Sequence, residues 1–372
     1  MHRSDIGATA VDAIRSTMQV DPEWTEHSAR GFAWWGNEFR QEVQSSAVWE
    51  EDGQQLARIT IRTTLLRCGS TAAATAQVLE QLNHHAPGGC FRRDGDEVVH
   101  EMGVLVDESA LAWVPYTVAV YGTLALTIAA QQAREAASVL GAKPAESAHP
   151  RSGRRGVPDD ILNVPRQLVI PGGLGGSAWD QPQQFAEAAN LLNATGLGFV
   201  ADASGRGGLM GEVGYGRESA FLVLAPTNDE DPSRRVGPPL DPHPHLGHGL
   251  IAWLVLPSGR SGEAPDEVSA RLNSLEIAPA QDWSEAGAMH FGAWIAGPGT
   301  VVAPAYKMFV PNLLANYVNV QNVAAHMAHR ARRISRLLVP GVEVLSGEHI
   351  ATLRLEQLER SRFVNASARR EH

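Results

Sequence analysis

The sequence predicts an α+β protein made of two tandem units, each with an antiparallel sheet flanked by helices. Three observations support this prediction. The chain has 372 residues, enough for two hydrophobic cores. Apolar residues alternate with polar ones in some segments and recur at helical spacing in others. The same order of predicted strands and helices then occurs twice along the chain, which indicates an internal duplication.

The first unit is predicted over residues 1–142. Its clearest strand covers 56–66, where Ile59 and Ile61 alternate with polar residues. Pro115 is expected at the first position of a long helix, where proline is favoured. The predicted elements are, in order, a helix over 6–19, strands over 32–46 and 56–66, a helix ending at Asn83, strands over 89–93 and 97–106, and a helix over 115–140.

The second unit is predicted over residues 166–340, after a linker over 143–165 that is rich in Pro, Gly and Arg. A polar insertion over 227–247 interrupts this unit, and a tail over 341–372 follows it. The insertion is longer than most loops, so it is either functional or flexible. The predicted elements are a helix over 183–195, strands over 198–201, 211–216, 220–225 and 246–256, a helix over 264–276, strands over 286–296 and 300–305, and a helix from Pro311 to about Leu338.

Similar residues recur at two fixed separations in the two units. The pairs 190 residues apart are Ile61 and Ile251, Val78 and Val268, Leu82 and Leu272, Asn83 and Asn273, and His100 and His290. The pairs 196 residues apart are Val114 and Val310, Pro115 and Pro311, and Tyr121 and Tyr317. We therefore expect Pro115 and Pro311 to begin equivalent helices, with Tyr121 and Tyr317 on equivalent faces.

This order of elements resembles the type III secretion chaperone-like fold, which is shared with the bacterial sensory transduction regulator (YbjN-like) family. The resemblance rests on the strand over 56–66, the helix ending at Val78–Asn83, the strand pair over 91–106 and the helix led by Pro115, each with its second-unit counterpart. The insertion over 227–247 and the fusion of two units depart from the family's pattern. The resemblance implies a covalent pseudo-dimer that binds partner proteins on its sheets and helices, and it carries over no functional residue.

The composition favours a soluble, cytoplasmic protein. The formal net charge is −10 and basic residues form no extended stripe, which argues against nucleic acid and anionic membranes as partners. Two cysteines, Cys68 and Cys90, do not make a disulfide scaffold. Residues 1–20 lack the apolar core of a signal peptide. The longest apolar run, 110–130, is interrupted by Pro115 and by polar residues, so we expect no membrane span.

The strongest metal-binding pattern is the segment Asp241-Pro-His-Pro-His-Leu-Gly-His248. Its two inner prolines favour extended backbone, which turns His243 and His245 toward the same side. Zn²⁺ accepts imidazole nitrogen and carboxylate oxygen, so His243, His245 and His248 are the candidate metal ligands. The alternative is a polar, Pro-rich loop that leads into the strand over 250–256.

Trp34 and Trp35 are the candidate partner-binding residues. Adjacent residues of a strand point to opposite faces, so both indoles cannot lie in one core. One of them is then exposed or covered by another element, and an exposed tryptophan on a sheet can anchor a protein partner. The alternative is core packing.

Two other groups of residues have simple structural interpretations. Four arginines, Arg330, Arg332, Arg333 and Arg336, fall in the last turns of the final helix, where cations suit the helix dipole. His100 and His290 each fall within a predicted strand, which favours a shared structural role over two active sites.

The sequence favours a non-enzymatic, protein-binding or chaperone-like function. Neither a GxSxG nor an HExxH motif occurs, and the glycines of 171–177 lack the spacing of a nucleotide-binding loop. We expect no catalytic residue and no cofactor, a protein partner, and either a monomeric pseudo-dimer or a homodimer. Two alternatives stay open: a metal-dependent enzyme centred on His243, His245 and His248, and a small-molecule sensor with a cleft between the units.

Overall fold

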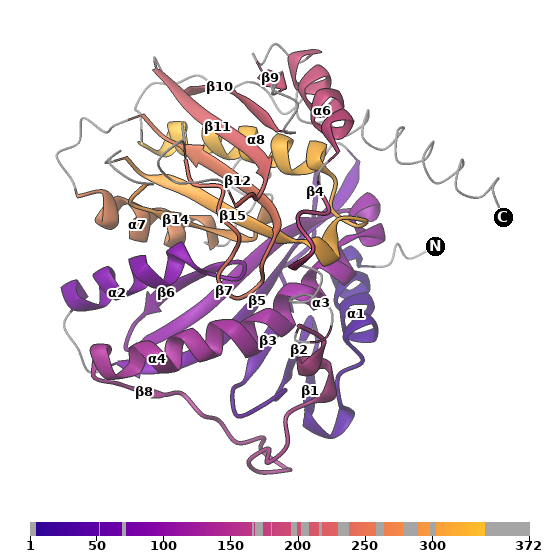
Figure 1. Cartoon of the computed structure of the whole chain (residues 1–372). Helices are drawn as coiled ribbons and strands as arrows, with labels where there is room; N and C mark the ends of the chain where they lie inside the picture. The colour runs from indigo at the N-terminus through magenta and orange to yellow at the C-terminus, as the bar shows by residue number, and fades with distance from the viewer. Residues whose placement is uncertain are drawn as a thin grey trace.

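The computed structural model describes residues 5–51, 53–68, 72–165, 167, 174–179, 181–194, 199–201, 208–215, 218–229, 238–257, 264–277, 289–297 and 303–338. Over these residues the chain is α+β, with helices packed on two antiparallel sheets (Figure 1). The predicted fold class is confirmed at this level.

The first sheet comes mainly from the N-terminal half of the chain. Its strands follow the order β1-β2-β3-β5-β7, and every neighbouring pair is antiparallel. β6 and β13 both pair with the remaining edge of β7, while β4 and β8 pair with the two ends of β5. The strands are β1 (Thr25–Ser28), β2 (Gly31–Trp34), β3 (Gln41–Ser45), β4 (Trp49–Glu51), β5 (Gln54–Cys68), β6 (Cys90–Asp94), β7 (Glu97–Val106), β8 (Ala142–Pro144) and β13 (Met289–His290).

Helices cover one face of this sheet, which we call its inner face. Ile59 and Ile61 of β5 point to this face and are buried in the main core, whereas Arg58 and Arg62 point to the outer face. The alternation predicted for β5 is therefore confirmed. The helices of this half are α1 (Ile6–Met18), α2 (Ala72–His84), α3 (Val114–Leu124), a π-helical turn (Ala125–Ala129) and α4 (Ala130–Leu140).

Buried amide side chains accompany the irregular middle of the long helix α3–α4. Gln41 donates through Nε2 to Gly122 O (3.0 Å) and accepts at Oε1 from Trp34 Nε1 (2.9 Å). Asn37 Nδ2 donates to Leu126 O (2.7 Å). A π-helical turn disturbs the regular ladder of main-chain bonds, and these side chains satisfy carbonyl groups in and before it.

Within the described residues, one helix is long and apolar enough to span a membrane by length and composition, and it covers Val114–Leu140. Inside the protein, 83% of its most apolar window is buried. The helix is thus packed as a core helix against the first sheet.

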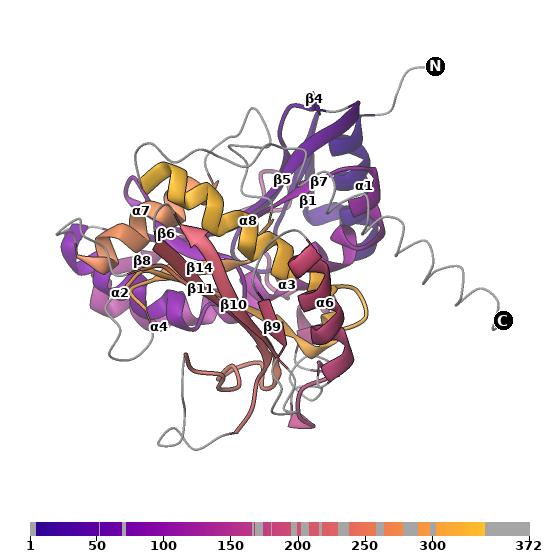
Figure 2. The ribbon, with the colours of Figure 1, turned by 90° about the horizontal axis from the view of Figure 1, so that it is seen from above.

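The second sheet has the strand order β14-β15-β12-β11-β10-β9, again antiparallel throughout. Leu222, Ala252 and Leu254 point to its inner face, and α8 lies across the sheet (Figure 2). The strands are β9 (Phe199–Ala201), β10 (Leu209–Tyr215), β11 (Glu218–Pro226), β12 (Gly249–Val255), β14 (Gly292–Ile295) and β15 (Ala305–Pro311), and the helices are α6 (Pro182–Ala194), α7 (Pro265–Ile277) and α8 (Val320–Leu338).

Five strands of each sheet follow one order: β2-β3-β5-β7-β6 in the first sheet and β10-β11-β12-β15-β14 in the second. Asn83 of α2 donates to Phe91 O (3.0 Å) and accepts from Phe91 N (2.7 Å). Asn273 of α7 makes the same two bonds with Trp294 (2.9 and 2.8 Å). These two asparagine clamps place α2 and α7 equivalently beside β6 and β14, at the predicted separation of 190 residues.

The separation of 190 residues does not extend into the strands. Ile61 lies on the inner face of the first sheet, whereas Ile251 lies on the outer face of the second. Because successive strand residues point to opposite faces, a shift of one residue exchanges the faces, and Ala252 is the true counterpart of Ile61. His290 is not the counterpart of His100, since it lies in β13 and pairs within the first sheet.

The expectation that Pro115 and Pro311 begin equivalent helices is wrong. Pro115 is the second residue of α3, but Pro311 ends β15, and a 3₁₀ turn (Asn312–Leu314) follows before α8 begins. Tyr121 is buried within α3, while Tyr317 is 42% exposed and precedes α8. The dipeptide Val-Pro occurs at both positions, but it begins a helix only at Val114-Pro115; at Val310-Pro311 it ends a strand.

The segment predicted as a linker packs along the first sheet. β8 pairs with β5, Ser147 N donates to Glu38 O (2.9 Å), and Asp159 N donates to Gly36 O (2.7 Å). This segment therefore covers part of the first unit instead of running free between the units. The boundaries proposed at 142/143 and 165/166 stay predictions, and the tail over 341–372 lies outside the described residues.

The asparagine clamps make a first prediction. Asn83→Ala and Asn273→Ala each leave one buried N–H and one buried C=O without a partner, so each should lower the free energy of unfolding by about 2–4 kcal/mol. Ser274→Ala, on an exposed position of α7 next to the second clamp, is the control and should change it by less than about 0.5 kcal/mol. Denaturant unfolding measures all three, and near-neutral results for either asparagine would contradict the equivalence of the clamps.

Candidate functional site

The histidine cluster predicted to bind metal lies in a loop over 238–248, which we call the flap. His243 is buried, and both of its ring nitrogens already have partners. Its Nε2 donates to His85 O of the first unit (3.1 Å), and its Nδ1 accepts from His245 N (3.2 Å), a tautomer assigned from these partners. Burial, with nearby Lys307 adding to it, lowers the pKa of His243 to about 3, which keeps the ring neutral.

The third histidine of the pattern points elsewhere. His248 Nδ1 lies 3.2 Å from Thr227 Oγ1, and its Nε2 lies 3.3 Å from Asp229 Oδ2. In the described part of the chain, no group of three or more His, Cys, Asp or Glu side chains is placed to hold a metal ion. The prediction that His243, His245 and His248 form a metal site is therefore corrected. The prolines were expected to keep the backbone extended, but the chain turns between His243 and Gly247. In this turn the N–H of each of these two residues donates to the carbonyl oxygen of the other at 2.8 Å.

Trp34 and Trp35 are both fully buried, so the prediction of an exposed tryptophan anchor is also corrected. Trp34 lies in the main core. Trp35 points the other way, as expected, but the predicted linker covers it: its Nε1 donates to Ser147 Oγ (3.3 Å), and the His149 ring packs edge-on at 4.9 Å. No indole surface remains there for a partner.

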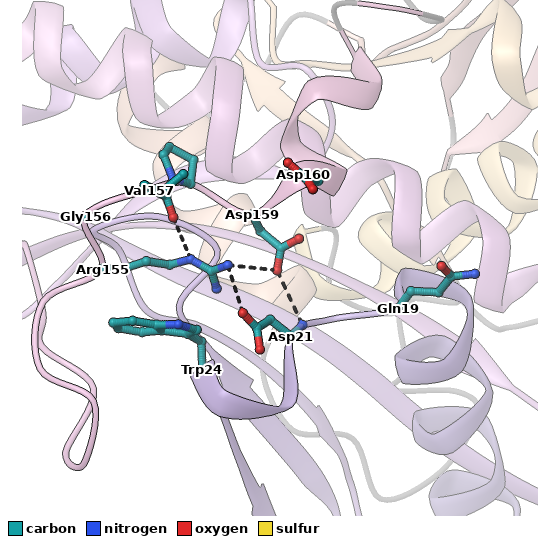
Figure 3. Close-up of a pocket in the computed structure, with 9 residues that line it drawn as sticks. Gln19, Asp21, Trp24, Arg155, Gly156, Val157, Asp159 and Asp160 are labelled. Carbon is teal, nitrogen blue, oxygen red and sulfur yellow. Dashed lines mark hydrogen bonds and ion pairs between the residues drawn. The ribbon is translucent and has the colours of Figure 1, made fainter.

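The same segment closes a hollow of about 580 Å³ beside α1 (Figure 3). Arg155 crosses the hollow, where its guanidinium pairs with Asp21 (3.2 Å) and Asp159 (3.5 Å) and lies 5.2 Å from the centre of the Trp24 ring. It also donates to Val157 O (2.9 Å). The contacts with Asp21 and Trp24 fasten the predicted linker to the first unit, so the residues around the hollow have a structural role.

A second, fully buried group of charges joins the two halves of the protein; we call it the junction cluster. The Glu276 carboxylate of α7 accepts from Arg330 Nε (2.7 Å) and Arg333 Nη1 (3.3 Å), both of α8. Arg58 of β5, in the first sheet, donates to the main-chain oxygen of Glu276. Arg330 also donates to Met289 O of β13, the strand that the second half adds to the first sheet.

Two guanidinium groups thus bind one carboxylate, and a third binds the main-chain oxygen of the same residue. Although burial opposes ionisation, Arg330 and Arg333 lower the pKa of Glu276 to about 2. Burial lowers the pKa of Arg58 to about 10, and its Nε and Nη1 have no hydrogen-bond partner among the residues that the structure describes. The sequence interpretation of Arg330 and Arg333 as dipole partners missed this role, because Glu276 lies more than fifty residues away and no local spacing connects them.

Cys90 and His290 meet at the edge of the junction cluster. His290 Nε2 lies 3.3 Å from Cys90 Sγ, and its Nδ1 lies 4.0 Å from Glu276 Oε2, an order that resembles a nucleophile, a base and an orienting acid. All three are completely buried. Burial raises the pKa of Cys90 well above its usual range and lowers that of His290 to about 3, so a neutral thiol faces a neutral imidazole. This state suits packing between the halves and not nucleophilic catalysis.

The outer faces of the two sheets differ in chemistry. On the first sheet this face is charged: Arg62 pairs with Asp94 (2.6 Å), and Arg92 pairs with Glu101 (2.5 Å). On the second sheet it is mainly apolar. Its described side chains include the apolar residues Met210, Phe221, Val223, Ala225, Ile251, Trp253, Val255, Ala293, Ile295, Ala305 and Phe309, and the charged residues Glu212 and Lys307.

The flap covers only part of this apolar face. Pro239 O accepts from Trp253 Nε1 (2.8 Å), and Leu240 packs on the same small cluster. Met210 and Phe221, at the side of β10 and β11, remain 43% and 37% exposed. The described part of the predicted insertion is thus a cover for the sheet and not a metal loop.

No family model, curated protein or solved structure matches the chain. The functional interpretation therefore depends on the geometry of the junction cluster and of the outer face of the second sheet.

The junction cluster makes a second prediction. Glu276→Gln leaves two buried guanidinium groups without their carboxylate and should lower the free energy of unfolding by about 3–5 kcal/mol at pH 7. Because the pKa of Glu276 is lowered from 4.5 to about 2, the native protein should also lose stability as the pH falls through that window, and the variant should lose less.

Glu267→Gln, at an exposed position of the same helix, is the matched control and should cost less than about 0.5 kcal/mol. Urea unfolding at pH 7 and at pH 3 measures both effects. Equal stability of the Glu276 and Glu267 variants would show that the cluster does not hold the halves together.

Proposed function

We propose that this protein is a non-enzymatic, chaperone-like adaptor that binds a partner protein on the outer face of its second sheet. In this proposal its two secretion-chaperone-like units form a covalent pseudo-dimer. The observation that carries the proposal is the partly uncovered apolar face around Met210 and Phe221, since the equivalent face of the first sheet is charged.

Contacts between the halves support the pseudo-dimer. α2 of the first half packs on β14 of the second, and α7 of the second half packs on β6 of the first. Two subunits related by a two-fold axis make reciprocal contacts of this kind, in which the same helix of each subunit packs on the same strand of the other. Cys90 of β6 and Ala293 of β14 occupy matching positions, one residue before Phe91 and Trp294, and they pack together with Ile277.

Three sequence predictions extend the proposal. A cytoplasmic location, the exclusion of nucleic acid and membranes as partners, and a monomeric pseudo-dimer or a homodimer follow from the acidic composition and from the resemblance. The sensor alternative has less support, because buried charged and apolar side chains pack together at the described junction between the halves. The enzyme alternative loses its metal ligands, as described above.

Site-specific photo-cross-linking tests the proposal. A benzophenone side chain at Phe221 should capture a distinct partner in cells that produce the protein, whereas the same group at Val139, an exposed position on α4, should not. Met210→Ser with Phe221→Ser should reduce recovery of that partner at least tenfold, since central apolar contacts carry most binding energy. Identical adducts from both positions, or recovery unchanged by the double substitution, would refute this surface.

A further inference from the structure

The flap is fastened to the first unit at the C-terminal end of α2. There the main-chain carbonyl groups of His84, the last residue of α2, and of His85, the next residue, accept hydrogen bonds from the second half. Lys307 Nζ donates to His84 O (2.6 Å), and His243 Nε2 donates to His85 O (3.1 Å). Gln132 Nε2 of α4 also donates to His85 O (2.8 Å). N–H donors satisfy the open carbonyl groups at a helix C-terminus, so the His243 contact docks the flap on α2, next to the Lys307 contact from β15.

The docked flap requires a neutral His243. Its Nδ1 accepts from a main-chain N–H at the flap turn, so a proton on that nitrogen would break the contact with His245 N. The same proton would create a second cation beside Lys307. The His243 ring packs 5.0 Å from Phe309 on the outer face of the second sheet, where it has little access to water.

We propose that the flap is a pH-dependent cover for the apolar outer face of the second sheet, docked while the His243 ring is neutral and released when that ring takes up a proton. Its use to admit a partner rests on the function proposed above. Release would expose Trp253, which Pro239 now caps, and would join it to the open area around Phe221.

Charged and titratable groups face the His243 ring from α2, from β15 and from the flap itself. α2 contributes Glu80 and His84, which pair at 3.3 Å, and β15 contributes Lys307. The flap itself contributes Asp241, whose charge acts on Lys307, and His245. Burial is the largest cause that lowers the pKa of His243, and the Lys307 charge adds to it; the same two causes lower the pKa of the neighbouring His85.

The docked state therefore binds fewer protons than the released state. With the pKa of His243 at about 3 when docked and an ordinary value of 6.5 when released, docking is strongest above pH 6.5 and weakens as the pH falls toward 3. Between pH 7 and pH 5 this one group shifts the docking equilibrium by roughly 25-fold toward release.

Hydrogen exchange on the full chain tests the proposal without a partner. After correction for chemical exchange rates, the opening constant of the flap amides, among them Leu246 and Gly247, should rise roughly 25-fold from pH 7 to pH 5. His243→Gln cannot take up the proton and should show less than about a threefold rise. His27→Gln, at an exposed histidine on β1, is the control and should behave as the native protein.

An equal rise in the native protein and in His243→Gln, or no rise in the native protein, would overturn the proposal. If His243→Gln does not fold, NMR titration of the native His243 ring decides: a ring that titrates near pH 6.5 without loss of flap protection would also overturn it. Because cross-linking at Phe221 is scored at pH 7, failure of the adaptor function and failure of the pH-dependent cover are separate results.

Discussion

The rest of the structure depends on the buried carboxylate of Glu276. Two arginines of α8 bind it, and an arginine of the first sheet reaches its main-chain oxygen. A buried charge is tolerated only when it is paired, so the helix and both sheets must meet in one arrangement for the cluster to form. Hydrophobic burial between the halves is non-directional, whereas this cluster fixes how they are oriented.

In the arrangement that the cluster fixes, the outer face of the second sheet is an apolar surface that the protein only partly covers. α2 and the flap cover its half near β14 and β15, and the side near β10 stays partly open. Soluble proteins seldom leave a contiguous apolar sheet face uncovered, which is why partner binding is the function we favour. In the pH-dependent cover that we propose, the His243 ring gives the same surface a means of control, because that ring is buried at a helix end that already carries a lysine ammonium.

Local signals were enough to predict the α+β class with antiparallel sheets and the pair of equivalent asparagines. Asn83 and Asn273 were found because each follows a helical apolar pattern at the same separation, and the structure gives them the same hydrogen bonds. Pro311 misled the prediction, since a Val-Pro dipeptide does not reveal whether a strand or a helix continues. The pairing of Ile61 with Ile251 was wrong by one residue, and a shift of one residue moves a side chain to the other face of a strand.

The candidate site could not be predicted in the same way. Trp35 was expected to be exposed or covered, and only the fold shows that the segment around Ser147 covers it. The histidine-rich segment has the composition of a metal site, but a turn directs His243 to a helix end instead. Contacts such as Arg58 with Glu276 join residues more than two hundred positions apart, and no pattern within one sequence indicates them.

Native-state hydrogen exchange across both sheets tests the central claim most directly. If the junction cluster makes the two halves one cooperative structure, the slowest amides of β5 and β7 and those of β12 and β15 should exchange with the same opening free energy. They should also lose protection together as denaturant is added. Two separate opening free energies, with one sheet exchanging while the other stays protected, would contradict the account.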